Sequence, residues 1–379
     1  MRRIPIAPRP NWQAKVEEWG LVFHTDEDLV YWNESAYYEF TAREIDEIET
    51  ATNKLHAMCL EAIDHVITEK RYYLFGFSPK VIQAIEWSWE AEPPTLYGRF
   101  DFVYDGFHPP KLLEYNADTP TALLEAAVIQ WKWLQDLFPH RDQFNSIWEG
   151  LVEQWTWLKT NRKLLGSQIH FGHGDLWEDE LTVAVLRDTA QEAGLATVSL
   201  LMENIGWDHA RQWFADENNM KIWTIFKLYP WEWMVKEQFG DLALDNLKDT
   251  QWIEPVWKMV LSNKALMALL YELFPSSPYL LPAYLDGPRS MRRYVEKAIL
   301  GREGANVTIY DGGSVVESRG GDYAASGSLF QEYVEIPNFD GNHPIIGSWI
   351  VGEDARGIGI RETYGLITDN MARFVPHLF

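Results

Sequence analysis

The sequence predicts a mixed α/β protein of the α+β kind, and three observations predict it. A long amphipathic helix is expected over Thr41–Lys70, and the alternation of polar and apolar residues over Leu96–Asn116 is typical of a β-hairpin. The last hundred residues read mostly as short strands. With 379 residues, 46% of them hydrophobic, the chain can bury a large core, which excludes a disordered protein.

Charge and composition exclude several classes of partner. The net charge of −23 argues against binding to a nucleic-acid polymer or to an anionic membrane. Cys59 is the only cysteine, so an intrachain disulfide and a cysteine-rich metal site are both excluded. No apolar run reaches membrane-spanning length. We therefore expect a cytoplasmic enzyme that acts on small molecules.

The N-terminal third is expected to be helical on both sides of the hairpin. A capping-box pattern, Thr41-x-x-Glu44, starts the long helix, and Pro79 starts a second helix that runs to about Glu90. A third helix is expected to start at Asp118 or Thr119, directly after the hairpin, and to run to about Phe138. Its free backbone N–H groups would then lie beside Asn116 and favour an anion there.

The rest of the chain alternates between strands and helices before it becomes mostly β. A strand over Gln168–Gly172, a helix over Leu176–Gly194 and a strand over Ala196–Met202 predict a parallel layer. A further strand is expected over Lys221–Leu228 and a helix over Asn263–Phe274. The strands expected after that are Tyr294–Ile299, Ala305–Tyr310, Ser314–Ser318, Leu329–Ile336, Ile345–Val351 and Gly357–Glu362.

The hairpin carries the most informative polar residues. Side chains two positions apart on a strand point to the same face, so Arg99 shares a face with Asp101, and Glu114 shares a face with Asn116. If the strands pair, these side chains form one polar patch. The opposite face is expected to be apolar and covered, with Phe100, Phe102, Leu113 and Tyr115.

Such a polar patch favours a metal and phosphate site. Carboxylate and amide oxygens are ligands that suit Mg²⁺, and arginine pairs with a phosphate or carboxylate. The alternative is a surface hairpin with ordinary salt bridges.

Three later features complete a candidate nucleotide site. The segment Glu296–Asn306 places Lys297 before a loop with Gly301 and Gly304, where glycines would let backbone amides approach phosphate oxygens; a plain hairpin loop is the alternative. The polar pair Gln331-Glu332 inside an apolar strand would contact an adenine edge, unless it is a solvated edge strand. Lys264 begins a helix and would otherwise be an ordinary surface lysine.

In this order, the motifs resemble one family. They are Arg-x-Asp, Glu-Tyr-Asn-Ala-Asp, Asn-Lys-Ala-Leu, Glu-Lys-x-Ile-Leu-Gly-Arg-Glu-Gly-Ala-Asn and Gln-Glu-Tyr. The chain resembles the glutathionylspermidine synthase family from about Pro10 to its C-terminus, and more closely the stand-alone bacterial acid–amine ligases. The resemblance implies an ATP-grasp fold with the metal-binding hairpin early in the chain.

The resemblance also implies roles for particular residues. Asp101, Glu114 and Asn116 match Mg²⁺ ligands, and Lys264 and Lys297 match the lysines that hold ATP phosphates, with Gln331 in the adenine pocket. The remaining positions match residues that contact the acid substrate or its acyl-phosphate, or that hold the peptide substrate: Arg99, Arg361, Thr119, Thr121, Glu203 and Arg302. Thr119-Pro120-Thr121 departs from the family's serine-rich segment, and Ala298 stands where the family has proline.

The function that the resemblance implies is ATP-dependent ligation of a carboxylic acid, for example a glutathione-like peptide, to an amine through an acyl-phosphate. ATP and Mg²⁺ are the implied cofactors. The alternatives are a peptide ligase and an ATP-binding protein without turnover. The chain would be one synthetase unit. Its approximate parts are 1–165 (helices and hairpin), 166–260 (α/β substrate region), 261–335 (nucleotide lid) and 336–379 (return to the central sheet). Cys59 lies on an apolar helix stripe and is expected to be structural.

Overall fold

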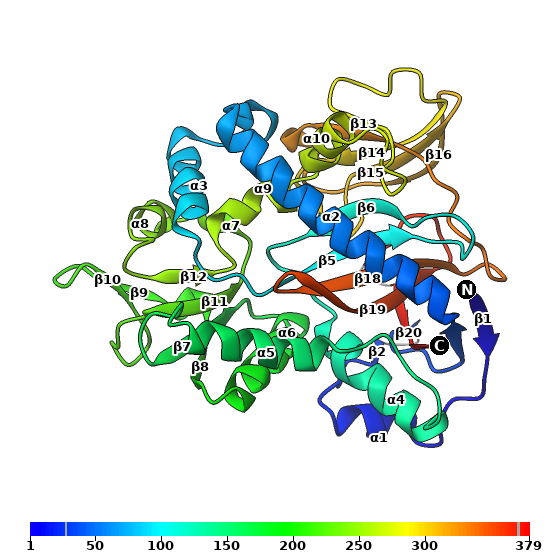
Figure 1. The fold of residues 1–379 in the computed structure, drawn as a ribbon, viewed down its shortest axis with the longest axis horizontal. Coiled ribbons are helices and arrows are strands. Elements are labelled where there is room, and N and C mark those ends of the chain that lie inside the picture. The colour runs from blue at the N-terminus through cyan, green and yellow to red at the C-terminus, as the bar shows by residue number, and fades with distance from the viewer. Residues whose placement is uncertain (27–28, 370–371) are drawn as a thin grey trace.

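An antiparallel sheet of five strands runs through the middle of the computed structural model, which describes residues 1–26, 29–369 and 372–379 (Figure 1). It joins the predicted hairpin to strands from the C-terminal end of the chain. In spatial order the strands are β20 (Arg373–Val375), β19 (Asp354–Thr363), β18 (His343–Val351), β5 (Tyr97–Val103) and β6 (Lys111–Asn116). The site residues of the hairpin therefore stand on the edge half of a continuous sheet.

Helix α2 (Ala42–Thr68) lies across one face of this sheet, as Figure 1 shows. The predicted capping box is present, because the Thr41 side chain accepts from the Glu44 backbone N–H and the Glu44 carboxylate accepts from Thr41. Cys59 and its apolar neighbours on α2 are buried in the same core cluster as Phe100 and Tyr115, whose rings stack 3.8 Å apart. The predicted second helix is α3 (Pro79–Ala91), which starts at Pro79 as expected.

A parallel sheet forms the part of the molecule to the left in Figure 1. The predicted strand–helix–strand unit is confirmed as β7 (Gln168–His173), α6 (Trp177–Glu192) and β8 (Ala196–Leu201). The sheet continues with β11 (Thr224–Leu228) and β12 (Gln251–Ile253), and α5 (Ile147–Thr160) packs against α6. β11 starts three residues later than predicted, because Lys221 makes an isolated bridge to Ala215 instead.

The third large sheet lies at the upper right in Figure 1 and is called the lid sheet here. Its strands are β13 (Ala283–Tyr284), β17 (Ser328–Glu332), β14 (Arg293–Ala298), β15 (Val307–Asp311) and β16 (Ser314–Arg319). Helix α10 (Ala265–Leu273) packs against β13 and β17. The predicted strand over Leu329–Ile336 ends at Glu332, and the predicted strand from Ala305 begins at Val307.

Smaller elements cover the remaining surfaces. The two ends of the chain meet, because β21 (His377–Leu378) pairs in parallel with β4 (Ala36–Glu39), which also pairs with β1 (Arg2–Pro5). Two short ribbons are β2 (Thr25–Asp26) with β3 (Leu29–Val30), and β9 (Gly206–Asp208) with β10 (Trp213–Ala215). The other helices are α1 (Trp12–Glu17), α4 (Gln130–Leu137), α7 (Trp231–Met234), α8 (Gly240–Asp245) and α9 (Met259–Ser262).

The helix predicted to start at Asp118 or Thr119 starts later. The helical run begins at Leu123 and passes through a π-helical turn, Glu125–Ile129, into α4. Asp118 cannot cap it, because its carboxylate accepts from the Lys227 ammonium at 2.6 Å and from the Trp231 backbone N–H at 2.9 Å. Ala122 also has a φ of 64°, which is outside the helical region. The expectation of free helical N–H groups beside Asn116 is therefore wrong.

Within the described residues, no helix is both long enough and apolar enough to cross a membrane.

Candidate active site

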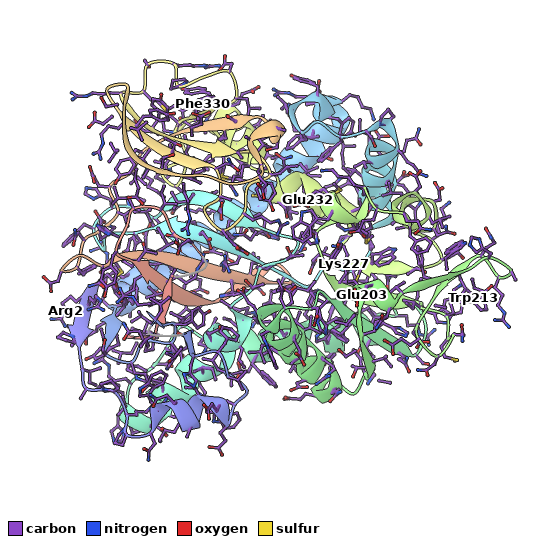
Figure 2. All side chains as sticks on the ribbon, turned by 180° about the vertical axis from the view of Figure 1, so that it is seen from behind. Arg2, Glu203, Trp213, Lys227, Glu232 and Phe330 are labelled. Atoms are coloured by element: carbon purple, nitrogen blue, oxygen red, sulfur yellow. The ribbon has the colours of Figure 1, made fainter. Side chains whose placement is uncertain are left out.

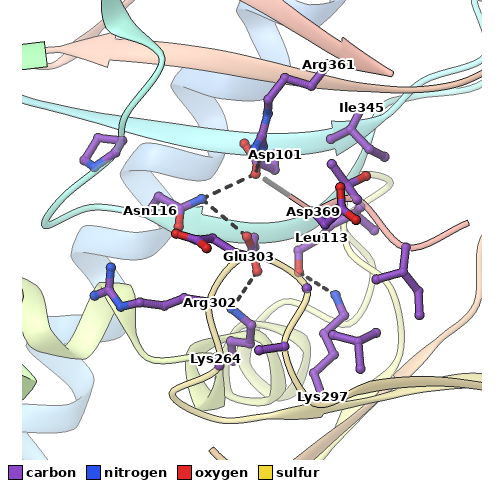
Figure 3. A pocket seen from close by; sticks show the side chains of 18 of the residues that line it. Asp101, Leu113, Asn116, Lys264, Lys297, Arg302, Glu303, Ile345, Arg361 and Asp369 are labelled. Atoms are coloured by element: carbon purple, nitrogen blue, oxygen red, sulfur yellow. Dashed lines mark hydrogen bonds and ion pairs between the residues drawn. The ribbon is translucent and has the colours of Figure 1, made fainter. Parts of the chain in front are cut away.

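A cavity of about 500 Å³ lies between the central sheet and the lid sheet, and Figure 3 shows it from close by. The structure brings almost all the predicted site residues into its lining. They are Arg99, Asp101, Glu114, Asn116, Thr119, Thr121, Lys264, Lys297, Gly301, Arg302, Gly304, Gln331, Glu332 and Arg361. Residues from positions 99 to 361 of the chain thus converge on one hollow.

The floor of the cavity is the polar face of the hairpin. Arg99 stands opposite Asn116, and Asp101 stands opposite Glu114, so the four side chains form one polar patch, as the alternation predicts for paired strands. A β-bulge follows Asp101, so that Phe102 pairs with Leu112 and Leu113 is skipped. The expectation that Leu113 lies on the apolar face is therefore wrong: Leu113 lines the cavity, and Leu112 is buried in the core instead.

Asp101 holds two arginines at one end of the floor. The Arg99 Nε donates to Asp101 Oδ1 at 2.7 Å, and the Arg361 Nη2 donates to Asp101 Oδ2 at 2.8 Å. Burial disfavours the Arg99 guanidinium, but the charge of Asp101 outweighs it and raises the pKa of Arg99. Gly347 on β18 makes room for this side chain, because a Cβ there would lie 2.8 Å from Arg99 Cδ. Two permanent cations are thus fixed beside a carboxylate.

Two lysines stand at the other end of the floor. Lys264 Nζ lies 2.6 Å from Glu114 Oε2, and Lys297 Nζ donates to Gln331 Oε1 at 2.8 Å. Burial opposes the ionisation of Glu114, but the charges of Lys264 and Lys297 lower its pKa to about 2. Burial also lowers the pKa of Lys297 to about 8. The backbone N–H of Lys264 donates to Ile299 O, which ties the start of α10 to the segment that follows β14.

The floor offers the donor atoms that Mg²⁺ prefers. Glu114 stays ionised, and its side chain is 28% exposed, although Lys264 now pairs with it. The Asn116 amide N–H₂ donates to Asp101 and Glu114 at 3.4 Å each, so its carbonyl oxygen makes neither of these bonds. Among the described residues no group of three or more His, Cys, Asp or Glu side chains could hold a metal. This set, with two carboxylates and one amide, fits an ion that completes its shell with phosphate oxygens and water.

The lid loop, residues 299–306, lines the cavity on the side opposite the floor. Gly304 has a φ of 72°, and a Cβ there would meet the Thr368 carbonyl oxygen at 2.7 Å; at Gly301 it would meet the Ala305 carbonyl oxygen at 2.8 Å. Both glycines are therefore required by close backbone approach. Between them, Arg302 donates to Thr119 Oγ1 at 3.0 Å and to Glu232 Oε1 at 2.5 Å.

An acidic wall lines the cavity beside Arg302, and the sequence reasoning missed it. The acidic wall consists of Asp175, Glu178, Asp179 and Glu303. Burial together with the charges of Glu178 and Glu303 raises the pKa of Asp179 to about 6. The signal in the sequence is the acidic first turn of α6, Glu178-Asp179-Glu180, and the sequence alone identifies this turn only as part of a helix.

Some predicted residues lie elsewhere. Glu203 lies on the short turn after β8, is exposed, and does not line the cavity (Figure 2). Cys59 is completely buried in α2, and burial raises the pKa of its thiol, so the expected structural role is supported.

Comparison with known proteins identifies the family. A family model described as "Glutathionylspermidine synthase preATP-grasp" matches residues 3–379. A Haemophilus influenzae protein named "Putative acid--amine ligase" is 43% identical over 394 residues, which cover 100% of both chains.

More distant relatives are longer proteins. Trypanothione synthetase of Crithidia fasciculata is 29% identical over 83% of this chain and 52% of its own length. The bifunctional glutathionylspermidine synthetase/amidase of Escherichia coli is 25% identical over 90% of this chain and 58% of its own length. The chain thus spans about half the length of these two proteins.

A solved structure shares the fold. The glutathione synthetase-like effector of Globodera pallida, in its apo form, superimposes with a TM-score of 0.58 over 97% of this chain and 95% of that one, at 9% sequence identity. This likeness shows the mixed α/β fold alone. The family model covers almost the whole chain, and the motifs that predicted the resemblance are the residues that meet in the cavity. The chain belongs to the glutathionylspermidine synthase preATP-grasp family.

Proposed function

We propose that this protein is an ATP-dependent ligase that joins a carboxylic acid to an amine through an acyl-phosphate. One observation carries the proposal: two arginines, two lysines, two carboxylates and an amide from four separate segments line one cavity, in a chain of this family. The proposal includes an ATP-grasp fold, in which the lid sheet and the central sheet enclose the nucleotide and the metal-binding hairpin comes early in the chain.

The floor residues would activate the acid. Mg²⁺-bound ATP supplies the phosphoryl group that turns the carboxylate oxygen into a leaving group. Asp101, Glu114 and Asn116 would hold the metal, and Lys264 and Lys297 would hold phosphate oxygens. Arg99 and Arg361 would steady the acid and the charge that develops on the transferred group. The lid loop would exclude water from the activated acid.

The nucleotide base would lie under the lid sheet. Gln331 is buried between Lys297 and the Leu112 carbonyl, to which its amide donates at 3.1 Å. Glu332 follows it and lines the same cavity. Side-chain and backbone polar groups of this strand suit the edge of an adenine ring. Gly301 and Gly304 would bring lid backbone amides to the phosphates.

The acidic wall supports an amine as the second substrate. Its carboxylates crowd together, because burial and Glu178 raise the pKa of both Asp179 and Glu303. An ammonium group would relieve this repulsion. Thr119 and Thr121 line the cavity on the hairpin side and would contact the acid substrate. The substrate role of Glu203 stays a prediction from the resemblance.

ADP release across a matrix of acids and amines tests the proposal. The expected result is ADP release that requires Mg²⁺, one acid and one amine together, with an amide product by mass spectrometry. Hydroxylamine in place of the amine should give a hydroxamate, which reports the activated acid. Product formed only from amino acids or peptides as amines would identify a peptide ligase. ATP binding without turnover on any pair would identify a non-catalytic protein.

The amine assignment has its own test. Asp179→Asn should raise the KM for the amine about tenfold or more while the KM for ATP changes little, because Lys264 and Lys297 bond to Glu114, Leu113 and Gln331 and not to Asp179 among the described residues. An unchanged amine KM would place the amine elsewhere.

A further inference from the structure

Arg302 is the cation of the lid loop, and its two terminal nitrogens each donate to a residue of another segment. Its Nη1 donates to Thr119 Oγ1 at 3.0 Å, and its Nη2 donates to Glu232 Oε1 at 2.5 Å. The Nε is buried and has no hydrogen-bond partner among the described residues. The guanidinium also lies 5.5 Å from the ring centre of Trp233. The negative charge that pairs with Arg302 is therefore already supplied by a residue of the chain, Glu232.

Glu232 is a dedicated partner for this arginine. It stands on the short helix α7, its side chain is 13% exposed, and within the described part of the chain its only ion pair is with Arg302. Figure 2 labels Glu232 between the lid sheet and the parallel sheet. A carboxylate attached to the protein competes at high effective concentration with any carboxylate from solution.

The surroundings make displacement of Glu232 costly. The acidic wall is negatively charged. Of the other cations of the cavity, Arg99, Lys264 and Arg361 are paired with the floor carboxylates. Lys297 donates to Gln331 and to the Leu113 carbonyl. The negative charge of Glu232 also acts on the buried Asp118. A substrate carboxylate that replaced Glu232 at Arg302 would add one more negative charge to this end of the cavity.

We propose that Glu232 is a specificity-determining residue, which occupies Arg302 in an ion pair and excludes substrates that bring a second carboxylate to this end of the cavity. The ligase would then select acids whose only free carboxylate is the one that reacts. This inference rests on the proposed function, because it names the class of acid for the same site.

A matched pair of peptides tests it by titration calorimetry of the full chain with Mg²⁺ and a non-hydrolysable ATP analogue. Glutathione has two carboxylates, and 4-aminobutyryl-cysteinylglycine is the same peptide without the α-carboxylate. The wild type should bind the second peptide at least tenfold more tightly. Glu232→Gln should gain at least tenfold in affinity for glutathione, because the freed Arg302 can then pair with its α-carboxylate.

Glu272→Gln is the control, because Glu272 makes a bidentate pair with Arg71 outside the cavity. It should keep the wild-type preference between the two peptides. The inference is overturned if the wild type binds glutathione as tightly as the shorter peptide. It is equally overturned if Glu232→Gln, still folded, gains no affinity for glutathione.

The thermal shift with Mg-ATP separates this inference from the proposed function. Glu232 does not contact the phosphate lysines, so each variant should keep that shift. A retained shift with an unchanged peptide preference refutes only the role of Glu232, whereas a missing shift in the wild type refutes the proposed function.

Discussion

The floor and the lid of the cavity are built in opposite ways. Every residue of β5 is buried, and the rings of Phe100 and Phe102 join the same core cluster as α2. The lid strand β16 is mostly exposed, with Val315 57% and Val316 49% accessible, and the lid sheet adds only Ala283 and Leu329 to that cluster among the described residues. The floor is thus held by packing in a shared core.

Polar contacts at a few points hold the lid instead. Glu317 accepts from the backbone N–H groups of Leu366 and Ile367, and Arg319 pairs with Asp369. Arg302 adds its bonds to Thr119 and Glu232. A few partly buried polar contacts can open without unfolding of the protein, whereas a packed core opens only with global unfolding. The floor half of the cavity is therefore the more rigid one, and the lid half can open without loss of the shared core.

The largest loss of activity is expected when the proposed metal ligands on the floor are replaced. Glu114→Ala or Asn116→Ala should lower Mg²⁺-dependent ATP turnover by about a thousandfold, because a missing ligand removes charge stabilisation that nothing else supplies. Circular dichroism and the melting curve should stay close to wild type, since both side chains face the cavity and not the core. Near-normal turnover at ordinary Mg²⁺ concentration in either variant would contradict the metal assignment.

The same contrast explains what the sequence could predict. Alternation in β5 and β6 fixed which side chains share a face, and the capping box and Pro79 located two helices. These signals are local. The bulge that turns Leu113 into the cavity left no local mark, because it depends on pairing geometry across two strands.

Tertiary contacts determine the roles of the residues that the sequence did not identify. Asp118 looked like a helix cap, but a buried bond from Lys227, more than a hundred residues away, recruited it. Glu178 and Asp179 of the acidic wall look like the favourable first turn of α6, and only the fold brings them to the same cavity as Arg302 and Glu303. Residues that gain their role from distant partners cannot be recognised by spacing.

A buried carboxyl group beside the central sheet should make the stability of the protein depend on pH. Glu125 lies under β19 with its carboxylate bonded to the Tyr31 hydroxyl, and burial raises its pKa to about 7. Because the folded state holds this proton more tightly than the unfolded state, stability should fall as the pH rises from about 4.5 to about 7. Glu125→Gln should remove this loss and stabilise the protein at pH 8 by on the order of 3 kcal/mol, but little at pH 4.5.

Urea unfolding of both proteins from pH 4.5 to pH 8 would measure that difference. A constant difference across the range would mean that Glu125 does not titrate there.

Nucleotide binding between the floor and the lid should stabilise the folded protein. Mg-ATP at about a hundred times its dissociation constant should add roughly 2.7 kcal/mol of stability. Lys297→Ala should blunt this gain, since Lys297 reaches from β14 of the lid to the Leu113 carbonyl of the floor at 3.2 Å. Melting temperatures measured against nucleotide concentration would show it. If no nucleotide shifted the wild-type melting temperature, the cavity would not be a nucleotide site.

Hydrogen exchange compares the halves directly. Without nucleotide, backbone amides in β15 and β16 should exchange at least about tenfold faster than those in β5, because few apolar contacts protect them. Mg-ATP should slow exchange over 300–319 and leave β5 nearly unchanged. Equal protection of the lid in both states would instead describe a static hairpin.

The smallest effect should come from a residue that belongs wholly to the packed half. Cys59 is completely buried on α2, and burial raises the pKa of its thiol, so no thiolate is available near neutral pH. Cys59→Ala should cost roughly 1 kcal/mol, the usual order for a small buried truncation. Denaturant unfolding would measure this cost.

Turnover should survive that change, because ligation through an acyl-phosphate needs no thiol and Cys59 does not line the cavity. Ser262 offers a control on an element of the same core, since its hydroxyl is buried without a hydrogen-bond partner among the described residues. Ser262→Ala should likewise leave turnover intact. A Cys59→Ala protein that folds and binds ATP but no longer forms product would reveal a thioester route, and the packed half would then contribute chemistry as well as support.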